Sequence, residues 1–160
     1  VNFSTNTSYH IVWVMDTATS TIKLYLDGTE VENLSTTQFA NVTTRTKSYL
    51  GRGNAENRYF DGQVKSFNIW NRALTSTEID TLYNQGRNYN LYGLRLDATQ
   101  DLLHSLFFET GNYQDRTGNS TVTLHNSPTV DNDGLNLVRA SSQYASLDST
   151  QIGDTTTLAF

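Results

Sequence analysis

Two carboxylates in the middle of the chain, Glu78 and Asp80, are the first candidates for catalysis. Hydrolysis of a glycosidic bond needs two carboxyl groups that face each other across that bond. Both residues fall within a predicted helix and have no third carboxylate partner, so we interpret them as part of a solvated helix surface. The sequence also lacks a nucleophile elbow, a phosphate-binding loop and a dinucleotide fingerprint, and its three histidines do not have zinc-ligand spacing. We therefore predict no catalytic residues, and a protein that is not an enzyme.

A loop at residues 112–119, with the sequence NYQDRTGN, is the candidate metal site. Calcium binds hard oxygen ligands, and the surroundings of Asp115, Gly118 and Asn119 offer them. We therefore predict that these three residues hold a structural calcium ion, the only cofactor that the sequence suggests. Asp131 and Asp133 also resemble part of a calcium loop, but no glutamate follows at the required distance. We interpret them as an ordinary turn.

Aromatic side chains are the candidate ligand contacts, because their apolar faces beside polar neighbours suit sugar rings. The same side chains also suit packing in a core or an interface. The loop at 52–58 is expected at one end of a β-sandwich, where contact residues concentrate. We predict that Arg58, Tyr59 and Tyr113 bind a ligand, and that Trp13 and Trp70 lie in the core. The other candidates are Tyr49, Tyr89 and Tyr92.

Composition limits the classes of function. The net charge of −5 argues against nucleic-acid binding through bulk electrostatics, and no apolar run approaches the ~20 residues of a membrane-spanning helix. The chain has no cysteine and hence no disulfide framework. Five sequons mildly favour an exported, glycosylated protein, although an Asn- and Thr-rich composition explains them equally well. They are at Asn2, Asn6, Asn33, Asn41 and Asn119.

The most informative pattern lies between Tyr59 and Gly86. Residues 66–70 alternate in polarity, which is typical of a strand. Thr75 and Glu78 then form a T-x-x-E capping box, and Leu74 and Ile79 have the spacing of a hydrophobic staple. The sequence therefore predicts one strand that leads into a helix at 76–85, with Gly86 as its left-handed C-cap.

The remaining segments predict strands and turns. Strands are expected at 9–15, 21–26, 48–51, 104–109, 121–125, 135–139, 143–147 and 155–160. Asp27-Gly28 predicts a type I′ turn. We expect a short strand from Val31, and a loop or an irregular edge strand at 32–47.

The segment DGQVKSFNIWNRALTSTEIDTLYNQG resembles the end of a laminin G-like domain, in the concanavalin A-like jelly-roll superfamily. In that family a late strand ends in a variant of Y-N-R-A-L-S before a short helix. YHIVWVMD and KLYLDG are similar to the same family. LFFETGNYQDRTGNSTVTL and GLNLVRASSQYASL resemble its opening strands. The resemblance implies an all-β sandwich of two antiparallel sheets with one short helix, and a calcium ion in the loop that contains Asp115.

The two parts of the resemblance occur in reversed order. Residues 1–90 resemble the closing half of a jelly roll, and residues 91–160 resemble its opening half. Three explanations stay open: an excerpt from a tandem array, a circular permutation, or a polymer subunit whose tail completes its neighbour. Because the chain begins at Val1 and ends within a strand, we expect it to be part of a longer protein.

The resemblance implies a non-catalytic extracellular binding or adhesion module, within a repetitive or multidomain protein at a cell or virion surface. Its expected partners are a glycan or an extracellular protein, and neighbouring copies or adjacent repeats, with no nucleic acid and no membrane insertion. The alternative is a structural repeat of an extracellular fibre or surface assembly. Fold analogy alone does not decide between them.

Overall fold

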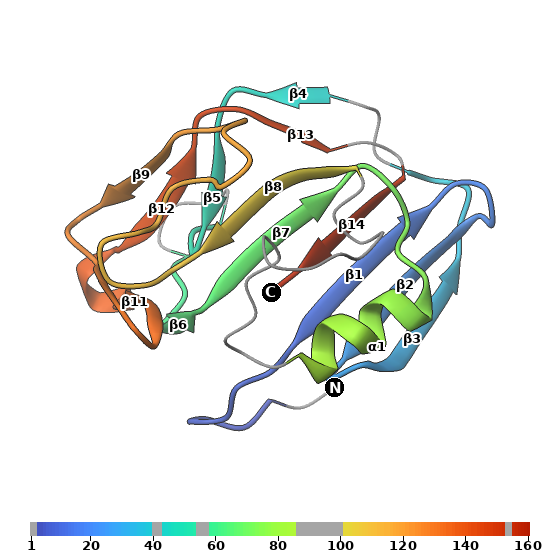
Figure 1. Ribbon diagram of the computed structural model, residues 1–160, viewed down its shortest axis with the longest axis horizontal. Helices are drawn as coiled ribbons and strands as arrows, with labels where there is room; N and C mark the ends of the chain where they lie inside the picture. The colour runs from blue at the N-terminus through green and yellow to red at the C-terminus, as the bar shows by residue number, and fades with distance from the viewer. Residues whose placement is uncertain (1–2, 40–42, 54–57, 86–100, 153–154) are drawn as a thin grey trace. The chain divides into compact units, whose positions relative to one another are not determined.

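The computed structural model describes residues 3–39, 43–53, 58–85, 101–152 and 155–160 (Figure 1). It contains two compact units. The first combines Val1–Val42, Asn68–Leu102 and Gly153–Phe160, and the second combines Thr43–Phe67 and Leu103–Ile152. The predicted fold class is confirmed: the described chain is all-β, with antiparallel sheets and one short α-helix, consistent with a concanavalin A-like β-sandwich.

The largest sheet has the strand order β3-β2-β1-β14-β7-β8, and the first unit contains β1, β2, β3, β14 and most of β7. The chain passes between the two units within β7 and β8. The strands are β1 (Ile11–Asp16), β2 (Thr21–Leu26), β3 (Thr29–Ser35), β7 (Ser66–Trp70), β8 (Leu102–Phe107) and β14 (Thr156–Ala159).

The turn between β2 and β3 has the predicted type I′ geometry. Asp27 and Gly28 both have positive φ, at 49° and 77°. A Cβ atom at Gly28 would also lie only 2.9 Å from Cδ1 of Tyr83. Both the backbone conformation and the close approach of this ring therefore favour glycine at this position.

The helix α1 (Ser76–Asn84) begins where the sequence predicts. The Glu78 amide donates to Oγ1 of Thr75 over 3.3 Å, and the Thr75 amide donates to Oε2 of Glu78 over 2.8 Å, which completes the capping box. Leu74 and Ile79 are both buried in the core of the unit, as a hydrophobic staple requires. The predicted C-cap Gly86 lies outside the described residues.

One face of this sheet shares a core with α1. The buried residues of that core are Val12, Val14, Tyr25, Trp70, Leu74, Ile79, Leu82 and Ala159. Because successive side chains of a strand point to opposite faces, Val12 and Val14 of β1 place Trp13 on the other face. The prediction of a core position is confirmed for Trp70, which is fully buried, and is wrong for Trp13, which is 47% exposed.

The second unit contains three small sheets. The first has the order β5-β12-β9, the second β10-β11-β6 and the third β13-β4. The strands are β4 (Thr43–Arg45), β5 (Ser48–Leu50), β6 (Gly62–Val64), β9 (Val122–His125), β10 (Thr129–Asp131), β11 (Gly134–Leu137), β12 (Tyr144–Leu147) and β13 (Thr150–Ile152). Leu106, Phe108, Leu135 and Leu147 are buried in its apolar core.

The turn that joins β10 to β11 confirms the interpretation of Asp131 and Asp133. Oδ1 of Asp131 accepts from the amides of Asp133, over 2.8 Å, and Gly134, over 3.2 Å. An aspartate that binds the amides after it in this way stabilises a turn.

Strands from either side of residue 90 pair in both units. In the first unit β14 lies between β1 and β7, and in the second β5 pairs with β12 and β6 pairs with β11. These pairings are long-range and antiparallel. The assignment of 1–90 as the closing half and 91–160 as the opening half of a jelly roll stays a prediction.

Candidate functional site

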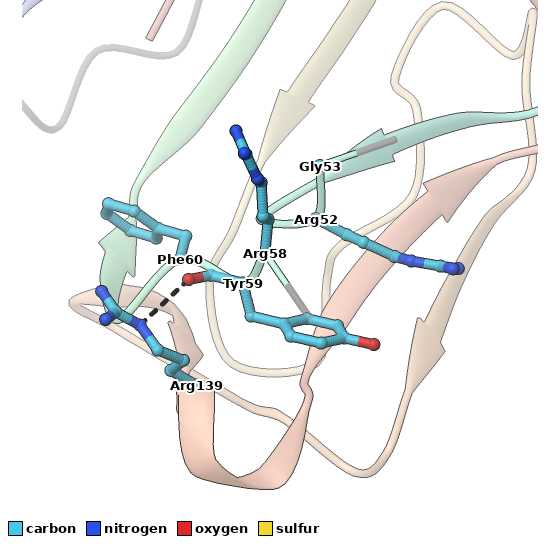
Figure 2. A pocket seen from close by; sticks show the side chains of 7 residues that line it. Arg52, Gly53, Arg58, Tyr59, Phe60 and Arg139 are labelled. Carbon is cyan, nitrogen blue, oxygen red and sulfur yellow. Dashed lines mark hydrogen bonds between the residues drawn. The ribbon is translucent and has the colours of Figure 1, made fainter. Parts of the chain in front are cut away.

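The second unit has a cavity of about 520 Å³, lined by Gly51, Arg52, Gly53, Arg58, Tyr59, Phe60 and Arg139 (Figure 2). Most of these residues belong to the loop that follows β5. Its two arms are joined by an isolated β-bridge between Arg52 and Tyr59. Two further backbone hydrogen bonds hold the arms: Gly53 N donates to Arg58 O over 2.7 Å, and Phe60 N donates to Gly51 O over 2.9 Å. The two described arms of the loop are therefore held side by side at the cavity.

Arg139 comes from a 3₁₀ turn (Arg139–Ser141) that follows β11. Its Nε donates to the carbonyl oxygen of Tyr59 over 3.1 Å, and its amide donates to Oδ1 of Asp61 over 3.3 Å. The first of these bonds uses the Tyr59 backbone, which leaves the Tyr59 ring out of the contact (Figure 2).

Arg52 lies over two tyrosine rings. Its Cζ is 4.9 Å from the centre of the Tyr49 ring and 5.1 Å from the centre of the Tyr144 ring. The ring of His125 stacks on Tyr144 at 4.2 Å, and His125 Nε2 lies 2.8 Å from Oγ of Ser146. Cation–π contacts of this kind orient a guanidinium group without neutralising its charge.

The structure brings two of the three predicted ligand-binding residues together. Arg58 and Tyr59 both line the cavity, whereas Tyr113 packs against the apolar core of the unit. Sequence reasoning missed Arg139, because its contact with Tyr59 joins residues that are 80 positions apart. Arg52 and Phe60 belong to the same loop as Arg58 and Tyr59. A prediction that the whole loop contacts a ligand would therefore have included them. Ligand binding by Arg58, Tyr59 and Tyr113 stays a prediction.

A second cavity of about 500 Å³, in the first unit, is lined by Thr19, Ser20, Ser35, Thr36, Thr37 and Gln38. These side chains offer hydroxyl and amide groups but no aromatic ring and no charge. The cavity beside Tyr59 is therefore the stronger candidate for specific recognition.

The predicted calcium ligand Asp115 is buried in the second unit, where its carboxylate accepts several hydrogen bonds. Oδ2 lies 2.7 Å from Nδ1 of His104. Oδ1 accepts from the Ser105 amide over 2.9 Å and from the amide and hydroxyl of Thr117 over 3.1 and 2.9 Å. Burial alone would raise the pKa of Asp115, but the bonds from His104, Ser105 and Thr117 outweigh it and leave the pKa below its ordinary value.

Both carboxylate oxygens of Asp115 have hydrogen-bond partners within the protein. Nδ2 of Asn119 donates to the carbonyl oxygen of Leu103 over 2.7 Å. Within the described ranges, no group of three or more His, Asp or Glu side chains has metal-binding geometry. A calcium ion at Asp115, Gly118 and Asn119 would have to displace these donors.

The described sequons are exposed. Asn6, Asn33 and Asn119 lie at the surface, while Asn2 and Asn41 fall outside the described residues. The amide of Asn33 donates to Oε1 of Glu30 over 3.2 Å. Glycosylation of the five sequons stays a prediction.

The antiparallel sheets and the single short helix define a β-sandwich protein. A laminin G family model, described as the concanavalin A-like lectin/glucanases superfamily, matches residues 1–80, and the chain belongs to this superfamily. No curated protein and no solved structure gives a match.

Membership supports a carbohydrate- or protein-binding module in general. Laminin G-like domains are generally non-catalytic and typically extracellular. In the part of the chain that the structure describes, no helix has the length and the apolar character needed to span a bilayer.

Proposed function

We propose that this protein is a non-catalytic extracellular adhesion module that binds a glycan at the cavity beside Tyr59. The observation that carries the proposal is that aromatic rings and hydrogen-bond donors line the same cavity. Phe60 is 47% exposed and Tyr59 is partly exposed, so both rings offer apolar surface to a ligand. The guanidinium groups of Arg52, Arg58 and Arg139 supply hydrogen-bond donors around them. Sugar rings, with apolar faces and hydroxyl edges, match such a surface.

Tyr59→Ala is expected to weaken glycan binding about tenfold or more, since a tyrosine at the centre of an interface commonly contributes over 1 kcal/mol. The substitution keeps the carbonyl oxygen that accepts from Arg139, so the loop retains its brace. Binding is measured by calorimetric titration of oligosaccharides that a glycan array selects.

Tyr83→Ala is the control for this experiment. Tyr83 is 40% exposed, belongs to the first unit and does not line the cavity. Equal losses for the two variants, or binding of a protein ligand with no glycan binding, would contradict the proposal. Tyr113→Ala tests the third predicted contact in the same titration.

A second candidate function is assembly with neighbouring copies, and the face of the large sheet opposite α1 favours it. We call this surface the Trp13 face. Trp13 pairs with Leu24 and with Leu158, and Ile22 pairs with Leu34, which places these side chains together. Trp13 is 47% and Leu34 is 54% exposed. The face is formed by Ile11, Trp13, Met15, Ile22, Leu24, Leu26, Leu34 and Leu158, all at least partly exposed. Contiguous apolar surface of this kind is typical of interfaces.

The neighbouring strand edge is less suited to association. β3 is the terminal strand of its sheet and is exposed along its whole length, but it carries Glu30 and Glu32. Charges on an edge strand oppose pairing with a second chain. A second copy is therefore expected to contact the Trp13 face rather than extend the sheet at β3.

Trp13→Ser is expected to abolish self-association. Sedimentation velocity over a wide range of protein concentration should show larger species for the unaltered chain and a monomer of 18.0 kDa for the variant. Val138→Ser, at a position that is 45% exposed in the second unit, is the control. A monomeric unaltered chain at every concentration would exclude this candidate.

We further propose that structural calcium, where it binds, uses the loop at 112–119. Calcium should then raise the melting temperature of the unaltered chain, and Asp115→Ala should abolish that rise. Differential scanning calorimetry with calcium and with a chelator measures the effect. A melting temperature that is the same in both conditions removes the proposal.

A further inference from the structure

Tyr49 and Tyr144 lie on the face of the sheet β5-β12-β9 that is opposite its core. Their strand neighbours Leu50 and Ala145 are buried in the apolar core of the second unit, and successive side chains of a strand point to opposite faces. Ser146 is directly opposite Tyr49 in the register of β5 and β12. Tyr144 is therefore the diagonal neighbour of Tyr49, which is within reach of an aromatic side chain. Strand pairing thus joins two tyrosines from distant parts of the sequence.

The two rings meet edge to face. Their centroids are 5.5 Å apart, and their planes are at 83° to each other. The ring of His125 stacks on Tyr144 at 4.2 Å, which holds the Tyr144 ring in place. Tyr49 is 39% exposed and Tyr144 is partly exposed, so the pair is accessible from solvent. Within the described ranges, the other contact between two tyrosine rings is that of Tyr59 with Tyr144, at the longer distance of 6.3 Å.

The guanidinium group of Arg52 lies over the faces of both rings. Its Cζ is 4.9 Å from the Tyr49 centroid and 5.1 Å from the Tyr144 centroid. Cation–π contacts of this kind hold the two rings as one cluster. The carbons next to the hydroxyl-bearing carbon lie at the ring edges, so the contact with Arg52 does not cover them. These are the carbons at which phenols couple when they are oxidised.

This tyrosine pair offers a covalent link in a chain that cannot form a disulfide, since the sequence has no cysteine. We propose that Tyr49 and Tyr144 form a dityrosine cross-link when a haem peroxidase oxidises the protein with hydrogen peroxide. The proposal is independent of glycan binding, because neither tyrosine lines the Tyr59 cavity.

The coupling reaction is balanced by the reduction of one molecule of hydrogen peroxide. Each phenol gives up one electron and one proton and becomes a phenoxyl radical. The two radicals join through a bond between ring carbons next to their oxygen-bearing carbons, and the hydrogen on each of these carbons moves to the oxygen as the rings become aromatic again. Hydrogen peroxide accepts the two electrons and two protons and becomes two molecules of water.

The cross-link is expected to stabilise the second unit. It joins β5 to β12 and closes a long loop, which restricts the unfolded chain in the same way as a disulfide between distant residues. The cross-linked protein should therefore melt at a higher temperature than the unmodified protein.

Treatment of the dilute full chain with a haem peroxidase and hydrogen peroxide tests the proposal. The monomer is then isolated by size-exclusion chromatography. Its mass should be lower by two hydrogen atoms, and it should show dityrosine fluorescence. Tandem mass spectrometry of its peptides should place the link between Tyr49 and Tyr144. Differential scanning calorimetry should show a higher melting temperature than that of the untreated monomer.

Tyr49→Phe keeps the ring but cannot form a phenoxyl radical, so the monomer of this variant is expected to lose the dityrosine signal. Tyr83→Phe is the matched control. Tyr83 is 40% exposed, and its ring contacts His10 rather than another tyrosine. The control is expected to form the cross-link to the same extent as the unaltered chain.

Four outcomes would overturn the proposal. The first is a treated monomer without dityrosine, and the second is a link that maps to Tyr59 and Tyr144 or to another pair. The third is an equal yield of dityrosine from Tyr49→Phe and from the unaltered chain. The fourth is an equal yield of this link in the urea-unfolded chain, which would show that the folded geometry does not direct the coupling. A cross-linked monomer that melts no higher than the untreated one would overturn the stabilising role of the link.

Discussion

Asp115→Ala is expected to lower the free energy of unfolding by about 3 kcal/mol or more, because a buried donor left without its acceptor costs about 1–3 kcal/mol and several donors share this carboxylate. The side chains of Asp115 and His104 are 0% and 4% exposed, so water cannot replace the lost carboxylate without a rearrangement. The Ser105 amide and the Thr117 amide and hydroxyl lose their acceptor as well. The loss is large against the roughly 5–15 kcal/mol that stabilise a typical domain.

Urea denaturation followed by far-UV circular dichroism measures this loss. Tryptophan fluorescence is not a suitable probe, since Trp13 and Trp70 both lie in the first unit and Asp115 lies in the second. Asp115→Asn keeps the shape and one acceptor oxygen, so a smaller loss is expected. Asp133→Ala is the control, because it removes an exposed carboxylate and should cost less than about 0.5 kcal/mol. A midpoint for Asp115→Ala equal to that of the control would contradict the prediction.

The pH dependence of this site has a definite sign. The pKa of Asp115 is lower in the folded protein than its ordinary value of 3.8. Its contribution is therefore fully present above that ordinary value, and is lost as the pH falls through the lower pKa of the folded state. The loss of stability caused by Asp115→Ala should thus be largest near neutral pH and diminish in acid.

Local patterns in the sequence were sufficient to predict the helix and its cap. The capping box needs only Thr75 and Glu78, three positions apart, and the staple needs only Leu74 and Ile79. Such contacts form between neighbours in the chain, so spacing alone determines them. The type I′ turn at Asp27 and Gly28 and the turn at Asp131 are local in the same sense.

The position of Trp13 could not be predicted, because a strand pattern shows that two faces differ but not which face meets the core. The sequence YHIVWVM is apolar on both sides, and the choice depends on α1, which follows about 60 residues later and packs on the side of Val12 and Val14. The position of β14 between β1 and β7 is equally non-local.

Only part of the candidate site could be predicted, because the rest depends on contacts between distant parts of the chain. Arg58 and Tyr59 lie in one loop whose composition predicts a contact surface, and both line the cavity. Arg139 reaches this loop from a distant turn. The bond between His104 and Asp115 joins two residues that sequence reasoning placed in separate roles, a scattered histidine and a calcium ligand. Hydrogen bonds between different elements have no signature in spacing.

Glu78→Gln is expected to cost roughly 2–3 kcal/mol of stability at neutral pH. Arg72 holds the Glu78 carboxylate with two hydrogen bonds, Nη2 to Oε1 over 2.6 Å and Nη1 to Oε2 over 3.0 Å, and the Thr75 amide donates to Oε2 over 2.8 Å. The bonds from Arg72, together with those from Thr75, lower the pKa of Glu78 from 4.5 to about 2. A pKa that is lower by one corresponds to about 1.36 kcal/mol, and partial exposure of both side chains, at 24% and 19%, reduces the total.

The pH dependence of the Glu78 contribution follows from the same lowered pKa. A carboxyl group whose pKa is lower in the folded than in the unfolded protein stabilises the fold above its unfolded value, here 4.5. That contribution is lost as the pH falls from 4.5 through about 2. The difference in stability between the unaltered chain and Glu78→Gln should therefore be constant from pH 7 to about 5 and nearly vanish at pH 2.

Urea denaturation at several pH values, followed by the fluorescence of Trp70 in the same core as α1, measures this difference. Trp13→Phe serves as the common background, so that the signal comes from Trp70 alone. Asp80→Asn makes the same change of charge at an exposed position of the same helix, and should change stability by less than about 0.5 kcal/mol at every pH. Since glutamine can still accept from the Thr75 amide, the pH-dependent part of the effect isolates the charged contact with Arg72. A Glu78→Gln difference that does not vary between pH 7 and pH 2 would show that the carboxylate charge contributes nothing to the stability of the first unit.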